Sequence, residues 1–144
     1  MKHIIEECNH IQAYLEISMS EDPAEAQERG KELAVYMART GKMLADAKQA
    51  LNERKSSDII TILKKAAKEA KATSTAVNEL VKSACKEEQY LVDWIERLNR
   101  TCTHQLDFCR SLMANARAEM NMNAWGGGGS SRAGIIPPPQ EPPY

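Results

Sequence analysis

Proline and aromatic residues are scarce over most of this 144-residue chain. Only Pro23 precedes residue 137 among the prolines, and the whole sequence holds one Phe, two Trp and four Tyr. An all-β fold needs frequent turn residues together with β-branched and aromatic strands, so this composition argues against one. Good helix formers such as Ala, Lys, Glu, Leu and Met dominate instead. We therefore predict an all-α fold.

The chain also lacks an excess of charge of one sign and lacks long apolar runs. Its 19 Lys and Arg residues against 20 Asp and Glu residues give a net charge of -1, so we do not expect binding to nucleic acid. No apolar run approaches the roughly 20 residues that span a bilayer, and the acidic pair Glu6-Glu7 does not fit a signal peptide. We expect a cytoplasmic protein without integral membrane contact.

Paired cysteine motifs are missing as well. Cys8, Cys85, Cys102 and Cys109 form no CxxC pair, which excludes zinc-ribbon and thioredoxin-like sites. A disulfide scaffold is not expected in a chain this long and this helical. The sequence predicts reduced cysteines that pack in the core.

Four helical segments follow from apolar residues that recur every three or four positions. We expect them over about residues 2–19, 23–54, 58–83 and 87–120. Gly30 and Gly41 mark either a break in the second segment or a close approach by a neighbour. Long helices with one apolar stripe each must pack together. The sequence therefore predicts an antiparallel four-helix bundle with short loops.

The composition changes sharply after Trp125. Residues 126–131 read Gly-Gly-Gly-Gly-Ser-Ser and contain four of the seven glycines, which is typical of an engineered flexible linker. Residues 132–144 contain five of the six prolines. We predict a helical bundle over residues 1–125, a linker over 126–131 and a fused proline-rich ligand peptide over 132–144, with the natural protein ending near Trp125.

The final segment has the composition of a peptide ligand. Its prolines favour an extended polyproline II conformation, which needs little further ordering on binding. The expected ligand residues are Ile135, Ile136, Pro137, Pro138, Pro139, Pro142, Pro143 and Tyr144. A short linker gives a fused peptide an effective concentration in the millimolar range. We therefore expect the peptide to be bound in cis by the bundle.

Three aromatic residues are candidates for the groove that binds this peptide. Tyr90 and Trp94 are four residues apart on one helix face, and Trp94 flanks the core position Ile95. Tyr36 flanks Met37 in the same way. Proline rings pack well on aromatic faces, so these residues predict a peptide-binding groove. Packing at the edge of the core is the alternative that the sequence leaves open.

The sequence contains no recognisable catalytic or metal-binding constellation. It has no phosphate-binding glycine loop outside residues 126–131 and no His-Glu-x-x-His motif. We therefore expect neither enzymatic activity nor a cofactor or metal. His104 has two interpretations, a phospho-acceptor in a phosphotransfer bundle or a partly exposed helix histidine. Lys64, Lys65, Lys68 and Lys71 form either a solvated face or a contact for an acidic surface.

Three stretches resemble the helical bundles of α-catenin and vinculin. They are Ser57-Asp58-Ile59-Ile60, Lys64-Lys65-Ala66 and Cys102-Thr103-His104-Gln105-Leu106-Asp107-Phe108-Cys109. The resemblance covers about residues 31–118 and implies a cytoskeletal adaptor of cell junctions, built from antiparallel helices. Bundles of that family often carry a fifth helix, whereas four are expected here, and we carry over no actin- or lipid-binding residue. The focal adhesion targeting bundle is a neighbouring alternative of similar shape.

Taken together, these patterns favour a non-catalytic adaptor or scaffold domain that binds a short proline-containing motif of a partner. The expected partners are the fused peptide and, through the resemblance, cytoskeletal or junction proteins. Two alternatives stay open. One is a cytoskeletal or oligomerisation module whose tail is a ligand for another domain. The other is a phosphotransfer module that uses His104.

Overall fold

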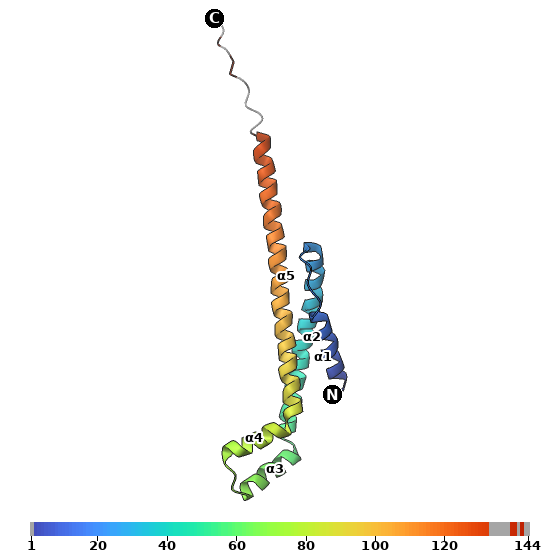
Figure 1. Ribbon diagram of the computed structural model, residues 1–144, viewed down its shortest axis with the longest axis vertical. Helices are drawn as coiled ribbons and strands as arrows, with labels where there is room; N and C mark the ends of the chain where they lie inside the picture. The colour runs from blue at the N-terminus through green and yellow to red at the C-terminus, as the bar shows by residue number, and fades with distance from the viewer. Residues whose placement is uncertain (1, 133–138, 141, 143–144) are drawn as a thin grey trace.

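The computed structural model describes residues 2–132, 139–140 and 142. Over these residues the chain is all-helical, which confirms the predicted fold class. The helices are α1 (Lys2–Leu15), α2 (Pro23–Lys55), α3 (Asp58–Glu69), α4 (Ser74–Ala84) and α5 (Lys86–Arg132). Figure 1 shows α2 and α5 side by side along most of α2, with α1 against them and the α3–α4 hairpin at one end.

The core lies where α1, α2 and α5 meet. Helices α2 and α5 run antiparallel, because Gly30 faces Cys109 whereas Gly41 faces Asn99. Helix α1 runs parallel to α5, since Gln12 bonds Trp94 whereas Leu15 bonds Gln105. The buried side chains of these helices are Cys8, Ile11, Leu15, Ala26, Leu33, Thr40, Met43, Ala47, Leu51, Leu91, Val92, Ile95, Leu98, Cys102, Leu106 and Cys109.

Gly30 marks a close approach of helices and not a break. Helix α2 is continuous through both of its glycines. The place that a Cβ atom would take at Gly30 lies 3.6 Å from Cδ1 of Leu106 and 3.8 Å from Cβ of Cys109. The missing side chain therefore lets α5 pack directly on the α2 backbone.

The third predicted helix is wrong as a single element, because it breaks between Glu69 and Ser74 into α3 and α4. Lys71 has a φ of 58°, and the amides of Lys71 and Ala72 donate to the carbonyls of Lys68 and Ala67. These two bonds satisfy the last carbonyls of α3 and form a Schellman end. The Thr73 hydroxyl then accepts from the Ala76 amide and caps α4.

The break changes the architecture from the predicted antiparallel four-helix bundle. Helix α3 contributes Ile60 and Ala67 to the buried residues, and α4 contributes none of its side chains. The hairpin bends away from the axis of α2 and α5 (Figure 1). The core is therefore formed mainly by three helices, and the helical hairpin is attached to it through the buried residues Ile60 of α3 and Cys85 between α4 and α5.

Two other boundaries differ from the predicted ones. Helix α1 ends at Leu15 and not near residue 19. Helix α5 does not end near residue 120, nor at Trp125, and includes residues 126–131, which were expected to be a linker. Each added residue of a formed helix gains a backbone hydrogen bond without a new nucleation cost. A long preceding helix can therefore extend through glycines that each cost about 1 kcal/mol.

Candidate functional site

Helix α1 is fixed to α2 and α5 by polar contacts at both of its ends, and this attachment shapes the surface grooves. Near its start, the carboxylate of Glu7 forms a two-pronged ion pair with Arg39; Nη2 of Arg39 lies 2.7 Å from Oε2 of Glu7. The hydrogen bonds from Arg39 hold the pKa of Glu7 below its ordinary value of 4.5.

The other end of α1 is held by Arg29 of α2. Its Nη2 donates to the carbonyls of Tyr14 and Ile17, each at 3.2 Å, and to Oε1 of Gln105 at 2.9 Å. Its guanidinium lies 4.2 Å from the centre of the Tyr14 ring. A cation placed on the last carbonyls of a helix is stabilised by the helix dipole. Arg29 therefore joins all three core helices.

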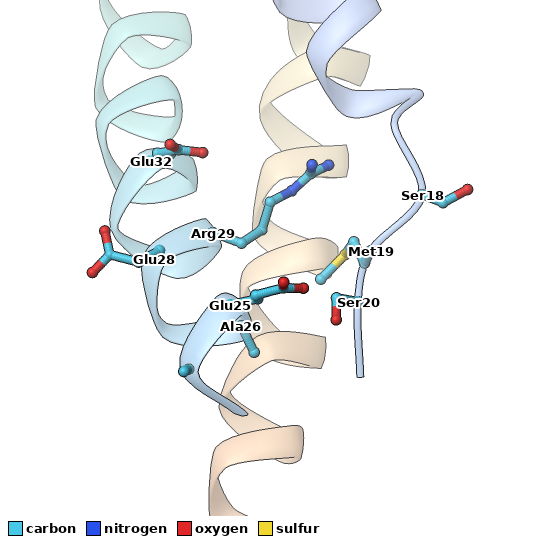
Figure 2. Close-up of a pocket in the computed structure, with 9 residues that line it drawn as sticks. Ser18, Met19, Ser20, Glu25, Ala26, Glu28, Arg29 and Glu32 are labelled. Carbon is cyan, nitrogen blue, oxygen red and sulfur yellow. The ribbon is translucent and has the colours of Figure 1, made fainter. Parts of the chain in front are cut away.

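Arg29 also lines a cavity of about 410 Å³ below the segment that connects α1 with α2. Figure 2 shows Ser18, Met19 and Ser20 of that segment opposite Glu25 and Arg29 of α2. Through Nη2 the guanidinium donates to two backbone carbonyls and to Gln105, whereas its Nε is buried without a hydrogen-bond partner in the described part of the chain. We assign Arg29 a structural role.

Tyr36 lies in a groove of its own, between α1 and α2. Its ring centre is 4.7 Å from that of Tyr14, and its hydroxyl lies 3.5 Å from Nε2 of His10. The hydroxyl of Tyr14 donates to Oε2 of Glu32 at 2.6 Å, and burial together with this bond raises the pKa of Tyr14. Tyr36 is therefore partly buried and packs against the core.

Tyr90 and Trp94 lie together in a second groove, on the α5 side of α1. Their ring centres are 6.0 Å apart, and Nε1 of Trp94 donates to Oε1 of Gln12 at 3.3 Å. The groove has a volume of about 550 Å³ and is lined by Ile5, Lys86, Glu87, Tyr90, Leu91 and Trp94. We call it the Tyr90–Trp94 groove. The structure thus brings two of the three predicted aromatic residues together and separates Tyr36 from them.

The Tyr90–Trp94 groove has an apolar floor and a charged rim. Tyr90 is 66% exposed and Ile5 is 42% exposed, so both are accessible from solvent. Lys86 and Glu87 line the groove, and Asp93 and Arg97 lie beside its aromatic pair. A mostly apolar cleft with a few polar groups at its edge is typical of sites that bind small ligands or peptide segments.

The predicted ligand peptide lies mainly outside the described residues. This holds for Ile135, Ile136, Pro137, Pro138, Pro143 and Tyr144. Pro139 and Pro142 are described and are exposed, so the structure does not place either proline in the groove.

Helix α5 also limits where the peptide can go. It rises about 57 Å between Trp94 and Arg132 at about 1.5 Å per residue. Residues 133–144 span at most about 43 Å when fully extended. While α5 is helical to Arg132, the segment does not reach the Tyr90–Trp94 groove of its own molecule.

Within the described residues, the other candidate side chains do not come together to form a binding or catalytic site. His104 is exposed on α5. All four cysteines are free and buried, as predicted, and burial raises the pKa of Cys8 to about 11, which keeps its thiol protonated. In the part of the chain that the structure describes, no three His, Cys, Asp or Glu side chains gather in a way that could hold a metal ion.

Sequence reasoning missed the residues that complete the groove, Ile5 and Leu91, and it missed Arg29. Ile5 stands next to the α1 stripe residue Ile4, and only the parallel alignment of α1 with α5 brings it to Tyr90. Arg29 precedes Gly30 on the core side of α2, and its role depends on where α1 ends. Neither position could be read from helical periodicity alone.

Comparison of the chain with protein-family models, curated proteins and solved structures finds no match in any of the three. Within the described residues, no helix combines the length and the apolar character that crossing a membrane requires.

Proposed function

We propose that this protein is a non-catalytic adaptor that binds a short proline-containing segment in the Tyr90–Trp94 groove. The exposed ring of Tyr90 beside the partly buried Trp94 carries the proposal. Tyr90 makes little use of its ring within the fold, since 66% of its surface is exposed. Polyproline segments bind to aromatic surfaces of this kind because the peptide is already extended and its rings stack on flat side chains.

The chain itself supplies a peptide of matching chemistry. Residues 132–144 contain two apolar anchors, Ile135 and Ile136, next to three consecutive prolines. Lys86 and Glu87 give the groove one charge of each sign, and residues 132–144 carry one charged side chain of each sign, Arg132 and Glu141. Electrostatics of this kind contribute more to orientation than to affinity.

A titration with a synthetic peptide of residues 132–144 tests this function. We expect changes in the ¹⁵N-labelled chain, monitored by NMR, at the indole N–H of Trp94 and at the amides around Tyr90. The Tyr90→Ala variant is expected to weaken binding about tenfold, which corresponds to about 1.4 kcal/mol. Because Tyr90 is exposed, the same change should leave the unfolding midpoint nearly unaltered.

Val35→Ala is the matched control. Val35 is an exposed apolar residue of the other groove, beside Tyr36, and its removal should leave the affinity unchanged. Chemical shift changes around Tyr36 and Val35 in place of Tyr90 and Trp94 would assign the peptide to the other groove and contradict the proposal. Absence of any change at millimolar peptide would end it.

One observation favours a second function, that of a cytoskeletal or oligomerisation module. The α3–α4 hairpin exposes Ile59, Ile62 and Leu80 at 62%, 67% and 43% of their surfaces, and the sequence in this region contributes to the resemblance to α-catenin and vinculin. Co-sedimentation with actin filaments tests this alternative, with Ile62→Ser as the variant. A chain that stays in the supernatant at all filament concentrations would eliminate it.

A further inference from the structure

Helix α1 supplies part of the Tyr90–Trp94 groove in addition to covering the core. Ile5 is one of the residues that line the groove, and Oε1 of Gln12 accepts the hydrogen bond of the Trp94 indole at 3.3 Å. Ile5 and Gln12 are seven residues apart, so they lie on the same side of α1, about two turns from each other. The other lining residues all belong to α5. The groove is therefore formed by two helices together and not by α5 alone.

The side chain of Gln12 is held in the orientation that Trp94 requires. Its Nε2 donates to Oε1 of Glu16, four residues further along the chain, at 2.9 Å. Because the amide nitrogen is bound to this carboxylate, the amide oxygen faces the indole. An indole has a single hydrogen-bond donor, Nε1, and the bond to Gln12 occupies it. This bond restrains the orientation of the Trp94 ring, whose flat surface is what a proline ring would contact.

The opposite edge of α1 attaches this helix to α2. Glu7 and Tyr14 are also seven residues apart and share that edge. The carboxylate of Glu7 pairs with Arg39 of α2, and the ring of Tyr14 packs on that of Tyr36. These four residues are not among those that line the Tyr90–Trp94 groove. One edge of α1 therefore holds the helix in place, and the other edge forms the wall of the groove.

Helix α1 depends on this attachment for its own structure. It has 14 residues, and isolated helices shorter than about 12–15 residues are marginal in water. Its buried side chains, Cys8, Ile11 and Leu15, would be exposed if α1 separated from α2 and α5. Formation and docking of α1 are therefore coupled, and a local opening of this helix would remove the wall of the groove.

We propose that Gln12 is a positioning residue for Trp94, and that binding of a peptide in the Tyr90–Trp94 groove is coupled to the docking of α1. This inference rests on the proposed function. Only the form with α1 docked has the complete groove, so a peptide that binds there stabilises the docked form by mass action. The same linkage makes peptide affinity depend on the contact between α1 and Trp94.

Hydrogen exchange of the full-length chain tests the coupling. Amide exchange is measured without and with the synthetic peptide of residues 132–144, at about ten times its dissociation constant. A ligand that binds only the docked form lowers the population of the open form about tenfold at this concentration. We therefore expect the amides of Cys8 and Ile11 to exchange about tenfold more slowly with peptide. The amides of α3, which does not line the groove, are the control and should be unaffected.

Two variants of Gln12 test its positioning role. Gln12→Leu has no oxygen for the indole, and we expect it to bind the peptide about fivefold more weakly, as the loss of one hydrogen bond predicts. The indole proton of Trp94 should move upfield in the ¹H–¹⁵N spectrum, because it loses its hydrogen bond. Gln12→Glu keeps an oxygen acceptor, so it should restore the indole resonance and most of the affinity. Equal weakening by the two variants would overturn the positioning role.

Gln49→Leu is the matched control. Gln49 of α2 donates to Glu53, four residues later, at 3.2 Å, which is the same local bond that Gln12 forms with Glu16. Gln49 is exposed and is not among the residues that line the groove. Its replacement should leave both the Trp94 indole resonance and the peptide affinity unchanged. A loss of affinity equal to that of Gln12→Leu would contradict the proposal.

These results are distinguishable from a failure of the proposed function. If the peptide binds at Tyr90 but exchange in α1 is unchanged, the coupling is overturned and the docking function stands. If Gln12→Leu binds the peptide as tightly as the parent chain does, the positioning role is overturned and the docking function again stands. If the peptide does not bind the parent chain, both the inference and the function are overturned. The exchange measurement uses the parent chain and does not depend on the folding of any variant.

Discussion

Single side chains from α2 and α5 decide how α1 is held. Arg39 pairs with Glu7, and Arg29 binds the last carbonyls of α1 and the side chain of Gln105. Helical periodicity places Cys8, Ile11 and Leu15 of α1 on one face, and all three are buried. The sequence did not predict these arginine contacts, because periodicity gives no information on which helix lies opposite a flanking charge.

At this scale the Glu7–Arg39 pair predicts a pH dependence. Arg39 holds the pKa of Glu7 below its ordinary value, so the contribution of the pair is complete above the ordinary glutamate pKa. It is lost as the pH falls through the lowered pKa of the folded state. Glu7→Gln should be less stable than the parent chain at pH 7, and the difference should shrink as the pH falls below 4.5 and disappear once the carboxylate is protonated in the folded state. Urea midpoints across this range measure it.

Glu28→Gln is the control for this prediction. Glu28 forms only an exposed pair with Lys31, three residues away on the same helix, and such pairs contribute little. Its stability difference from the parent chain should be small at every pH. A difference for Glu7→Gln that is constant from pH 7 to pH 2 would contradict the role of the carboxylate.

The division of residues 58–84 into α3 and α4 is the main feature at the scale of elements. The heptad pattern was continuous through this region and predicted one helix. The break depends on local backbone chemistry, the Schellman end at Lys71 and the cap at Thr73, which periodicity cannot detect. Thr73 was a readable N-cap residue, but Lys71 occupies a position at which glycine is expected.

Lys71→Gly should therefore stabilise the hairpin. A residue with a side chain at a positive φ costs roughly 1 kcal/mol or more, and glycine avoids this cost. Hydrogen exchange of the α3 amides should slow about fivefold, which corresponds to about 1 kcal/mol. Lys68→Gly, placed within α3, should instead speed exchange by a similar factor. Equal effects of the two glycines would contradict the assigned end of α3.

The whole molecule divides its buried side chains unequally between the three-helix core and the α3–α4 hairpin. The sequence predicted the helical class and most of the core, since long amphipathic helices bury one stripe each. It did not predict the offset of α5 relative to α2, because the number of residues in a helix does not fix which part of it is covered. For the same reason the sequence did not separate Tyr36 from Tyr90 and Trp94.

This unequal division predicts different costs for two leucine truncations. Leu98 is 1% exposed within the core, so Leu98→Ala should cost about 2–5 kcal/mol through the cavity it leaves. Leu63 of α3 is only partly buried, and Leu63→Ala should cost less than about 1.5 kcal/mol. Chemical denaturation followed by circular dichroism gives both values. A larger cost for Leu63 would show that the hairpin is part of the cooperative core.

The parallel course of α1 and α5 determines how the fold would respond to tension. A force that pulls Lys2 and Arg132 apart draws α1 lengthwise against α5. The Glu7–Arg39 pair, the Trp94 indole bond and the Arg29 contacts would then be strained simultaneously in shear. Rupture in shear requires these contacts to break together. We therefore expect α1 to resist a force along its axis and to detach more easily under a force perpendicular to it.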